Sequence, residues 1–414
     1  LNLGDKFDTS NVTDMSYMFS ECYKLTTLNL GDKFNTSNVT NMQHMFSNCY
    51  KLTALDLGDK FNTSNVTSMS SMFSNCQNLT TLNLGDKFNT SNVTSMSSMF
   101  SSCQNLTTLN LGDKFNTSNV TEMTGMFYNC RSLTMIKGIE NWDVSNVKYI
   151  GASGTNNKTS GMFSGCSSLT SLNLNNWDTK SMIDISYVFC DCTNLVDLNI
   201  SNFNTSQVTK MYGVFYGCRN LTSLNINDWD TAKVTCMTYM FASCDSLITI
   251  DISDWNVENV VYMESMFANC ISLVEFNANN WNTENLSSIN SMFQNCQALI
   301  SLYVNNWNTK QIRDAECAFF SCYSLTSLNL DGWNTQNMYN LRYMLAYCKS
   351  LVELNLCSWD TKKTSIMKDM FTNCFSLSVL KIGANTKIIS DANLKGTKWK
   401  RDSTGEIYTR DQLY

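Results

Sequence analysis

One short motif, Phe-x-x-Cys, recurs along almost the whole chain at a nearly constant interval. Fourteen copies run from Phe19 and Cys22 to Phe371 and Cys374, and in one copy Leu345 takes the place of the Phe. Successive copies are 27 residues apart over the first four steps, 36 residues apart once, and 26 residues apart over the last eight. A period of this size is the signature of a solenoid, in which each unit buries its apolar face only against its neighbours.

Each repeat carries two apolar patterns within the sequence aromatic-(Asn/Asp)-Thr-x-x-Val-x-x-Met-x-x-Met-Phe-x-x-Cys-x-x-Leu-x-x-Leu-x-Leu. In residues 15–22 the two Met, the Phe and the Cys fall at i, i+3, i+4 and i+7, which predicts one face of a short helix. The leucines of residues 25–30 predict a short strand with an inward apolar side. We therefore expect an α/β solenoid, a right-handed leucine-rich repeat array of 14 coils with one short parallel strand and one short helix per coil.

The repeats divide the chain into an array and an end segment. We expect the solenoid over residues 1–382 and a C-terminal cap over residues 383–414, where the repeat pattern stops. The single 36-residue step adds a polar, Gly-rich stretch, residues 151–161, which predicts a loop that bulges from one coil. Leu1 aligns with Leu28, inside a predicted strand, so we also expect more sequence upstream of the first residue.

Three residue types recur at inward-facing positions. The cysteines of the repeat are expected to be small, buried, free thiols, with bridges between neighbouring coils as the alternative, because stacked strands lie within disulfide reach. The Met stripe at helical spacing predicts core. The recurrent tryptophans, from Trp177 to Trp359, predict burial between coils, with a carbohydrate-binding platform as the alternative. Cys236 and Cys317 lie outside the repeat column, on positions expected to face outward.

Composition and spacing argue against several classes of function. The formal net charge of −6 disfavours a protein that binds nucleic acid by neutralising phosphates, and no apolar run approaches the roughly 20 residues of a membrane helix. His44 is the only histidine and no Cys-x-x-Cys pair occurs, so we expect no zinc site and no cofactor. Asp and Lys repeat in adjacent columns, as in Asp5 and Lys6, which predicts solvated charge ladders, with calcium binding as the alternative. We expect no enzyme, because no convergent catalytic pair is present.

The outward positions of the predicted strands differ between the two halves of the chain. In the first half they form an uncharged Thr and Asn lattice, which raises adsorption to an ordered surface such as ice as one alternative. In the second half apolar residues stand beside carboxylates, which is typical of a protein-binding surface, although exposed strand positions also favour β-branched residues in general. The candidate binding residues are Val196, Asp197, Ile248, Asp251, Val274, Glu275, Ile300, Tyr303, Val352 and Glu353.

The repeat resembles a known family. The string Met-Phe-Ser-Gly-Cys-Ser-Ser-Leu-Thr-Ser-Leu of residues 162–172, recurring with period 26, is similar to the BspA-like leucine-rich repeats of bacterial surface proteins. The closer resemblance is to the Trp-(Asp/Asn)-Thr…Met-Phe-x-x-Cys subtype found in mycoplasmas, lactobacilli and other Gram-positive bacteria, and it covers residues 1–382.

The resemblance implies a non-enzymatic module at the bacterial cell surface that recognises or adheres to host or neighbouring-cell macromolecules. The expected partner is a host or bacterial surface protein or glycan, bound through the strand face, with lateral or end-to-end self-association as a further possibility. The family implies no catalytic residues and no cofactor. The alternative function is a structural spacer or stalk that displays another domain.

Overall fold

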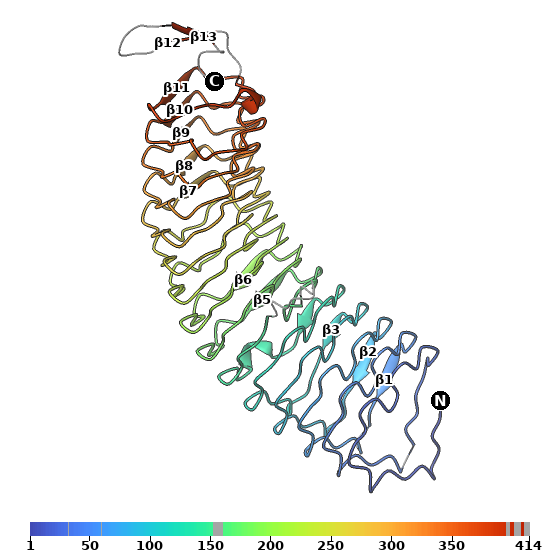
Figure 1. Cartoon of the computed structure of the whole chain (residues 1–414). Coiled ribbons are helices and arrows are strands. Elements are labelled where there is room, and N and C mark those ends of the chain that lie inside the picture. Colours follow the sequence, from blue (N-terminus) through green and yellow to red (C-terminus); the bar gives the residue numbers. More distant parts are fainter. Residues whose placement is uncertain (32, 59, 152–159, 395–397, 401–406, 410–414) are drawn as a thin grey trace. The chain divides into compact units, whose positions relative to one another are not determined.

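Each repeat makes one coil, and successive coils stack through short parallel strands (Figure 1). The computed structural model describes residues 1–31, 33–58, 60–151, 160–394, 398–400 and 407–409. The chain forms two units, residues 1–208 and residues 209–414. Each unit is a run of stacked coils.

Among the described residues of the N-terminal unit, six short strands lie on one side of its coils. In-register parallel pairs join β1 to β2, β3 to β4 and β5 to β6, so that for example Leu55 lies opposite Leu82. The elements of this unit are β1 (Ala54–Asp56), β2 (Thr81–Asn83), β3 (Thr108–Leu109), β4 (Met135–Ile136), the 3-10 turn η1 (Ile139–Asn141), β5 (Ser171–Asn173) and β6 (Asp197–Asn199).

The C-terminal unit continues the same arrangement. Strands β7 and β8 pair in parallel, and β9, β10 and β11 form a three-stranded parallel sheet. The elements are β7 (Glu275–Asn277), β8 (Ser301–Tyr303), β9 (Ser327–Asn329), β10 (Glu353–Leu356), β11 (Val379–Ile382), the 3-10 turn η2 (Ser390–Ala392), β12 (Lys398–Lys400) and β13 (Ile407–Thr409). The pair β12–β13 is antiparallel and lies in the segment for which the sequence predicts a cap.

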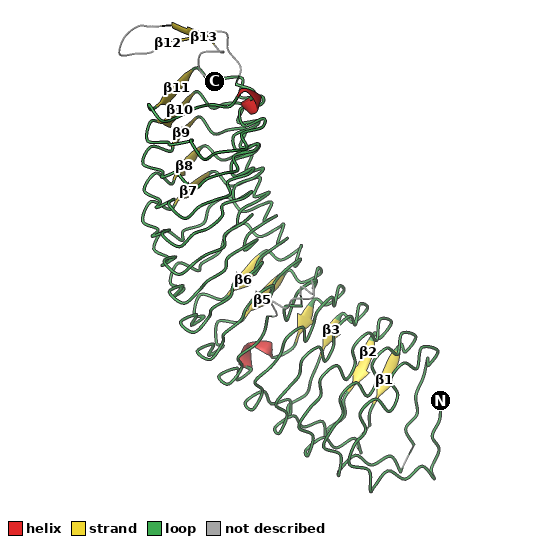
Figure 2. Ribbon diagram, viewed as in Figure 1, coloured by secondary structure: helices red, strands yellow, loops and turns green. Residues whose placement is uncertain are grey.

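The prediction of a short helix in each coil is wrong. In the part of the chain that the structure describes there is no α-helix, and the only helical elements are η1 and η2 (Figure 2). Residues 15–22 form successive turns, with hydrogen bonds from the Met18 N–H to the Met15 oxygen and from the Ser20 N–H to the Tyr17 oxygen. Between these turns, alternate N–H groups donate to carbonyls of the next coil at 2.8–3.0 Å, from Met15 to Asn41, Tyr17 to Gln43, Phe19 to Met45 and Glu21 to Ser47.

Coil spacing explains why turns replace a helix. An α-helix with its side chains is about 10–12 Å wide, whereas neighbouring strands lie about 4.8 Å apart. On the turn side, the ring centroids of Phe46 and Phe73 are 5.6 Å apart and those of Phe19 and Phe46 are 5.4 Å apart. Coils this close leave no room for a helix, so the chain satisfies its backbone groups across coils, as a β-sheet does. The fold is a parallel β-solenoid.

The sequence carried a signal for these turns. The residue two places after the first Met and the residue just before the Cys adopt left-handed backbone angles, as at His44 (φ 56) and Asn48 (φ 62). The position before the Cys is repeatedly Asn or Gly, the residues that accept this conformation most easily. A helical pattern of apolar residues interrupted by such residues favours turns over a helix.

The predicted core columns are confirmed. Met42, Phe46, Cys49 and Leu52 are fully buried, and the same positions are buried in coil after coil. The tryptophans of the repeat column are also buried. Six of them donate their indole N–H to backbone oxygens of the preceding coil at 2.9–3.1 Å: Trp177, Trp255, Trp281, Trp307, Trp333 and Trp359. Because these tryptophans are buried, they cannot form the carbohydrate-binding surface that was the alternative prediction for this column.

Polar side chains form ladders between coils. The buried hydroxyl of Thr63 donates to the Asn89 oxygen and accepts from the Asn89 N–H, both at 2.7 Å. The Asn65 side chain donates to the Ser37 oxygen at 2.7 Å, and Asn92 does the same with Ser64 at 2.6 Å. These side chains satisfy backbone groups that the short strands leave unpaired, which explains why the Asn-Thr-Ser-Asn sequence recurs.

The nine-residue insertion leaves and re-enters its coil at glycines. Residues 152–159 of the predicted loop lie outside the described residues, but Gly151 and Gly161 on either side are described. The Met162 N–H donates to the Ile150 oxygen at 2.8 Å, so the coil closes across the insertion. A side-chain carbon at Gly161 would lie 1.9 Å from the Tyr187 backbone oxygen, and only glycine fits there.

Candidate functional site

The ten residues predicted to form a binding surface all lie on the outward side of the strand segments. Eight are exposed, and Val274 and Glu353 are half-buried. Two of the ten, Val196 and Asp197, belong to the N-terminal unit, and the other eight belong to the C-terminal unit.

In the C-terminal unit, three of these residues form a continuous apolar ridge. Ile248, Val274 and Ile300 occupy the same position in successive coils, and backbone hydrogen bonds of 3.1 Å and 2.8 Å join them. Ile248 is 50% exposed and Ile300 is 48% exposed. The neighbouring coils carry Thr222 and Thr326 at this position, so the backbone does not require an apolar residue there. We call Ile248, Val274 and Ile300 the strand ridge.

Tyr303 extends the strand ridge with an exposed aromatic ring. It lies on β8, three residues after Ile300, where most other coils carry Asn or Asp. At that position an Asn or Asp oxygen accepts the N–H two residues on, as Asn277 does from Asn279 at 3.2 Å. Asp251 does the same with Ser253, so its recurrence is explained by turn formation. Tyr303 cannot form this local hydrogen bond with its side chain, and the residue is 42% exposed.

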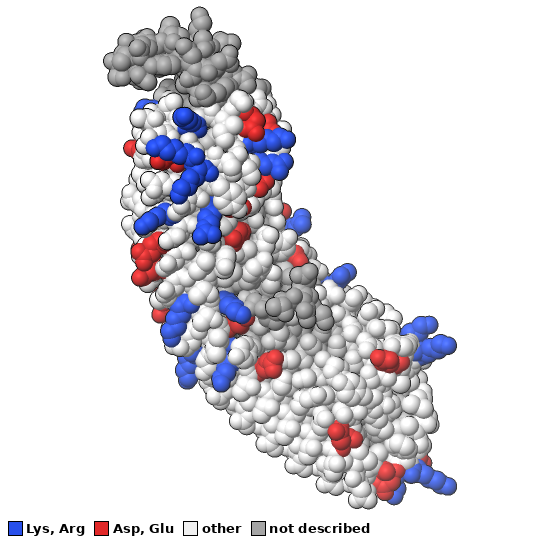
Figure 3. Space-filling view, viewed as in Figure 1, with Lys and Arg blue, Asp and Glu red and all other residues white. Residues whose placement is uncertain are grey.

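The carboxylates of the predicted surface differ in their surroundings. Glu353 on β10 forms an ion pair with Lys381 on β11, which partly neutralises it. Glu275 on β7 is exposed beside the strand ridge. Asp197 on β6 is exposed next to Val196. On the face drawn in Figure 3, positive and negative side chains both occur along the C-terminal unit.

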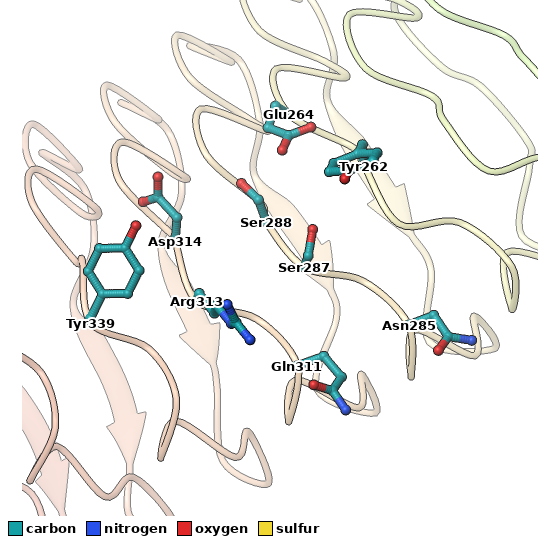
Figure 4. A pocket seen from close by; sticks show the side chains of 9 residues that line it. All are labelled: Tyr262, Glu264, Asn285, Ser287, Ser288, Gln311, Arg313, Asp314 and Tyr339. Carbon is teal, nitrogen blue, oxygen red and sulfur yellow. The ribbon is translucent and has the colours of Figure 1, made fainter.

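A second candidate site lies on the turn side of the C-terminal unit, and the sequence did not predict it. In this unit, residues at the position before the first Met of the consensus repeat pair in parallel from coil to coil, from Tyr262 to Ser288 and on to Asp314 and Asn340. Small serines between large neighbours leave a groove of about 520 Å³ there, lined by Tyr262, Glu264, Asn285, Ser287, Ser288, Gln311, Arg313, Asp314 and Tyr339 (Figure 4). We call it the tyrosine groove.

Most groups in the tyrosine groove are polar and keep hydrogen-bonding capacity. Glu264 accepts from the Thr238 hydroxyl at 2.9 Å, and Asp314 accepts from the Asn290 side chain at 3.2 Å. Each carboxylate can still accept further bonds. In Figure 4 the two carboxylates lie toward one edge of the groove, and the amides of Asn285 and Gln311 lie toward the other.

Arg313 and the two tyrosines complete the groove. Within the described residues the Arg313 guanidinium has no ion-pair partner, and it lies in an exposed position on the same coil as Asp314. Tyr262 is 50% exposed and Tyr339 is 46% exposed. The groove was not predicted from the sequence, because a helix in each coil would not align Tyr262, Ser288 and Asp314 in one row.

The cysteines offer little reactive chemistry. All eighteen are free thiols, and fourteen of them are buried. Burial raises the pKa of the Cys130 and Cys322 thiols to about 12, so both are protonated at neutral pH. Cys236 and Cys317 are partly buried rather than fully outward, and Cys357 is exposed. Burial also raises the pKa of Cys317, to about 11.

The described residues lack two kinds of feature. No cluster of three or more His, Cys, Asp or Glu side chains suited to a metal ion occurs among them. Nor does the described part of the chain include a helix with the length and apolar character of a membrane span.

A family model described as Mycoplasma protein of unknown function, DUF285, matches the chain four times, over residues 2–108, 54–159, 157–275 and 262–382. The chain belongs to this family. The four overlapping matches span the array of the DUF285 repeats, including both the strand ridge and the tyrosine groove. No curated protein matches the chain in sequence.

Solved structures relate the DUF285 fold to leucine-rich repeat proteins. A leucine-rich repeat protein from Bacteroides ovatus superimposes with a TM-score of 0.50 at 19% identity, covering 92% of this chain and 81% of that one. A leucine rich cell surface protein from Faecalibacterium prausnitzii matches with a TM-score of 0.38 at 16% identity, covering 90% of this chain and 83% of that one. The Bacteroides likeness supports the fold: a parallel solenoid similar to leucine-rich repeat proteins.

Proposed function

We propose that this chain is a non-enzymatic recognition module of the bacterial cell surface, which binds a macromolecule of a host or neighbouring cell through its strand face. The cell-surface location rests on the resemblance of the repeat to bacterial surface proteins.

The observation that carries the proposal is the strand ridge of Ile248, Val274 and Ile300. These β-branched residues of three successive coils, two exposed and one half-buried, lie beside the Tyr303 ring and the Glu275 carboxylate and provide an apolar centre with a polar rim. Protein interfaces commonly have this arrangement. The hydrogen-bonded coils hold these side chains in fixed positions, which lowers the entropy cost of binding.

The first experiment removes the ridge without changing the backbone. The triple variant Ile248→Thr, Val274→Thr and Ile300→Thr places at each site the residue that Thr222 and Thr326 already supply in this column. Beads coated with this variant should attach to epithelial monolayers at least about tenfold less than beads coated with the parent chain. Ile271→Thr, at an exposed position outside the column, is the matched control and should attach normally.

A second variant tests the carboxylates of the same face. Charge reversal by Asp197→Lys, Glu275→Lys and Glu353→Lys should weaken attachment while the circular dichroism spectrum stays unchanged. Full attachment by both triple variants would exclude the strand face as the binding surface.

A spacer that displays another domain is the competing function, and the uniform Thr and Asn face of the first repeats is compatible with it. A spacer tolerates loss of any whole repeat. Deletion of residues 275–300 removes part of the ridge, whereas deletion of residues 63–89 does not. If the recognition function is right, only the first deletion abolishes attachment.

A further inference from the structure

We propose that the tyrosine groove binds a short, uncharged oligosaccharide. This goes beyond recognition by the strand face, because it assigns a separate site on the turn side of the coils and a different class of ligand.

The size of the groove fits a small ligand. Its volume of about 520 Å³ lies within the roughly 300–1,000 Å³ of small-molecule sites. Tyr262 and Tyr339 lie three coils apart, about 14 Å at a spacing of about 4.8 Å per coil. A disaccharide or trisaccharide laid across the coils spans that distance. A protein partner needs about 800 Å² of contact with an apolar centre, which a narrow polar groove does not supply.

The polar groups of the groove suit hydroxyls in particular. Carboxylates only accept hydrogen bonds and a guanidinium only donates them, whereas a sugar hydroxyl does both. A sugar lying in the groove can therefore donate to a carboxylate such as Asp314 and accept from Arg313. Two carboxylates, Glu264 and Asp314, and one guanidinium, Arg313, line the groove, so its net charge disfavours an anionic ligand.

The two tyrosines supply the apolar contacts. Their rings are half exposed, and no described contact in the structure engages either phenol hydroxyl. The electron-rich face of an aromatic ring packs against polarised C–H groups, which line one side of a pyranose. The serines Ser287 and Ser288 between them leave space for the sugar and add hydroxyls. The Ser287 hydroxyl already donates to the Val261 oxygen at 2.9 Å, so its lone pairs remain available to accept a hydrogen bond.

The test is calorimetric titration of the whole chain with maltotriose, cellotriose and triacetylchitotriose. At least one should bind with a micromolar to millimolar Kd, and Tyr262→Ala and Tyr339→Ala should each weaken it about tenfold. Tyr303→Ala, which removes an equally exposed tyrosine from the strand face, is the control and should bind the sugar normally. The Tyr303→Ala variant also distinguishes the two proposed sites. It should weaken attachment to cells through the strand face and leave sugar binding in the tyrosine groove unchanged.

Three outcomes would overturn the proposal. The first is that none of the three sugars binds at millimolar concentration. The second is that a sugar binds but the Tyr262→Ala and Tyr339→Ala variants bind it as the parent does. The third is that sialyllactose or a short peptide binds the groove more tightly than every uncharged sugar, which would assign an anion or a peptide instead.

Discussion

The indole N–H of Trp333 donates to the backbone oxygen of Val304 in the preceding coil, over 3.0 Å. Trp333 is completely buried, and its ring stacks on that of Trp307 with centroids 6.1 Å apart. The same side chain therefore contributes apolar packing and ties one coil to the next.

We expect Trp333→Phe to lower the free energy of unfolding by about 1–3 kcal/mol, through the lost hydrogen bond and the smaller ring. Phe occupies this column naturally at Phe203, so the shape is tolerated. Urea unfolding followed by circular dichroism measures the change. Trp333→Ala should cost more, about 3–5 kcal/mol. Equal stability of Trp333→Phe and the parent would show that the indole bond contributes nothing.

Gly161 and Gly138 each require glycine, but for two different structural reasons that substitution by alanine can distinguish. At Gly161 a side-chain carbon would overlap the Tyr187 backbone, whereas at Gly138 nothing lies within 4 Å and the backbone has φ 78. We expect Gly138→Ala to cost about 1–2 kcal/mol, the penalty of a left-handed residue. Gly161→Ala should cost more, because overlap with backbone atoms forces the coil to shift. Thermal unfolding measures the stability of both variants. A smaller loss of stability for Gly161→Ala than for Gly138→Ala would contradict this expectation.

Thiol accessibility should follow burial. Of the eighteen cysteines, Cys357 is exposed, Cys22, Cys236 and Cys317 are partly buried, and the remaining fourteen are buried. Ellman's reagent should therefore titrate at most four thiols in the native protein, and all eighteen after denaturation. Cys357→Ser should remove one rapidly reacting thiol. Rapid reaction of more than four native thiols would show that the coils open readily.

Alkaline pH should destabilise the fold. Burial raises the pKa of the Cys130 and Cys322 thiols from 9.0 to about 12, so the folded chain holds these protons more tightly than the unfolded chain. The free energy of unfolding is then highest below about pH 9 and falls as the pH rises from there toward about 12. Urea unfolding across this range measures the slope.

A matched variant isolates the thiols from other groups that titrate at high pH. Cys130→Ala and Cys322→Ala together should make the decline shallower, although they lower stability at neutral pH by removing buried sulfur. Equal slopes for the parent and this double variant would mean that the column thiols do not cause the alkaline loss.

The stacked architecture could be predicted from the sequence, because a regular 26- or 27-residue period with inward apolar columns has few other solutions. The burial of Phe46, Cys49 and Trp333 followed from the same pattern. The helix could not be excluded on apolar spacing alone, since residues at i, i+3, i+4 and i+7 also face one side in a run of tight turns. The left-handed residues at His44 and Asn48 decide between the two.

The candidate sites were predictable to different degrees. Strand positions such as Ile248 and Tyr303 alternate with inward leucines, so their outward direction followed from the sequence, while their role in binding stays a prediction. The turn role of Asp251 required the observed hydrogen bond to Ser253. The tyrosine groove required the observed alignment of Tyr262 with Ser288, which an assumed helix would have placed differently.

The lateral hydrogen bonding of the coils has a consequence for how such chains change length. Because both the strand side and the turn side of a coil bond mainly to the adjacent coils, a duplicated coil meets neighbours that already match it. The nearly identical repeats between Phe34 and Phe115 are what slippage or unequal crossing-over within a gene would produce. Each such event adds or removes a whole coil without creating an unpaired backbone, so selection can adjust the reach of the array independently of its binding surfaces.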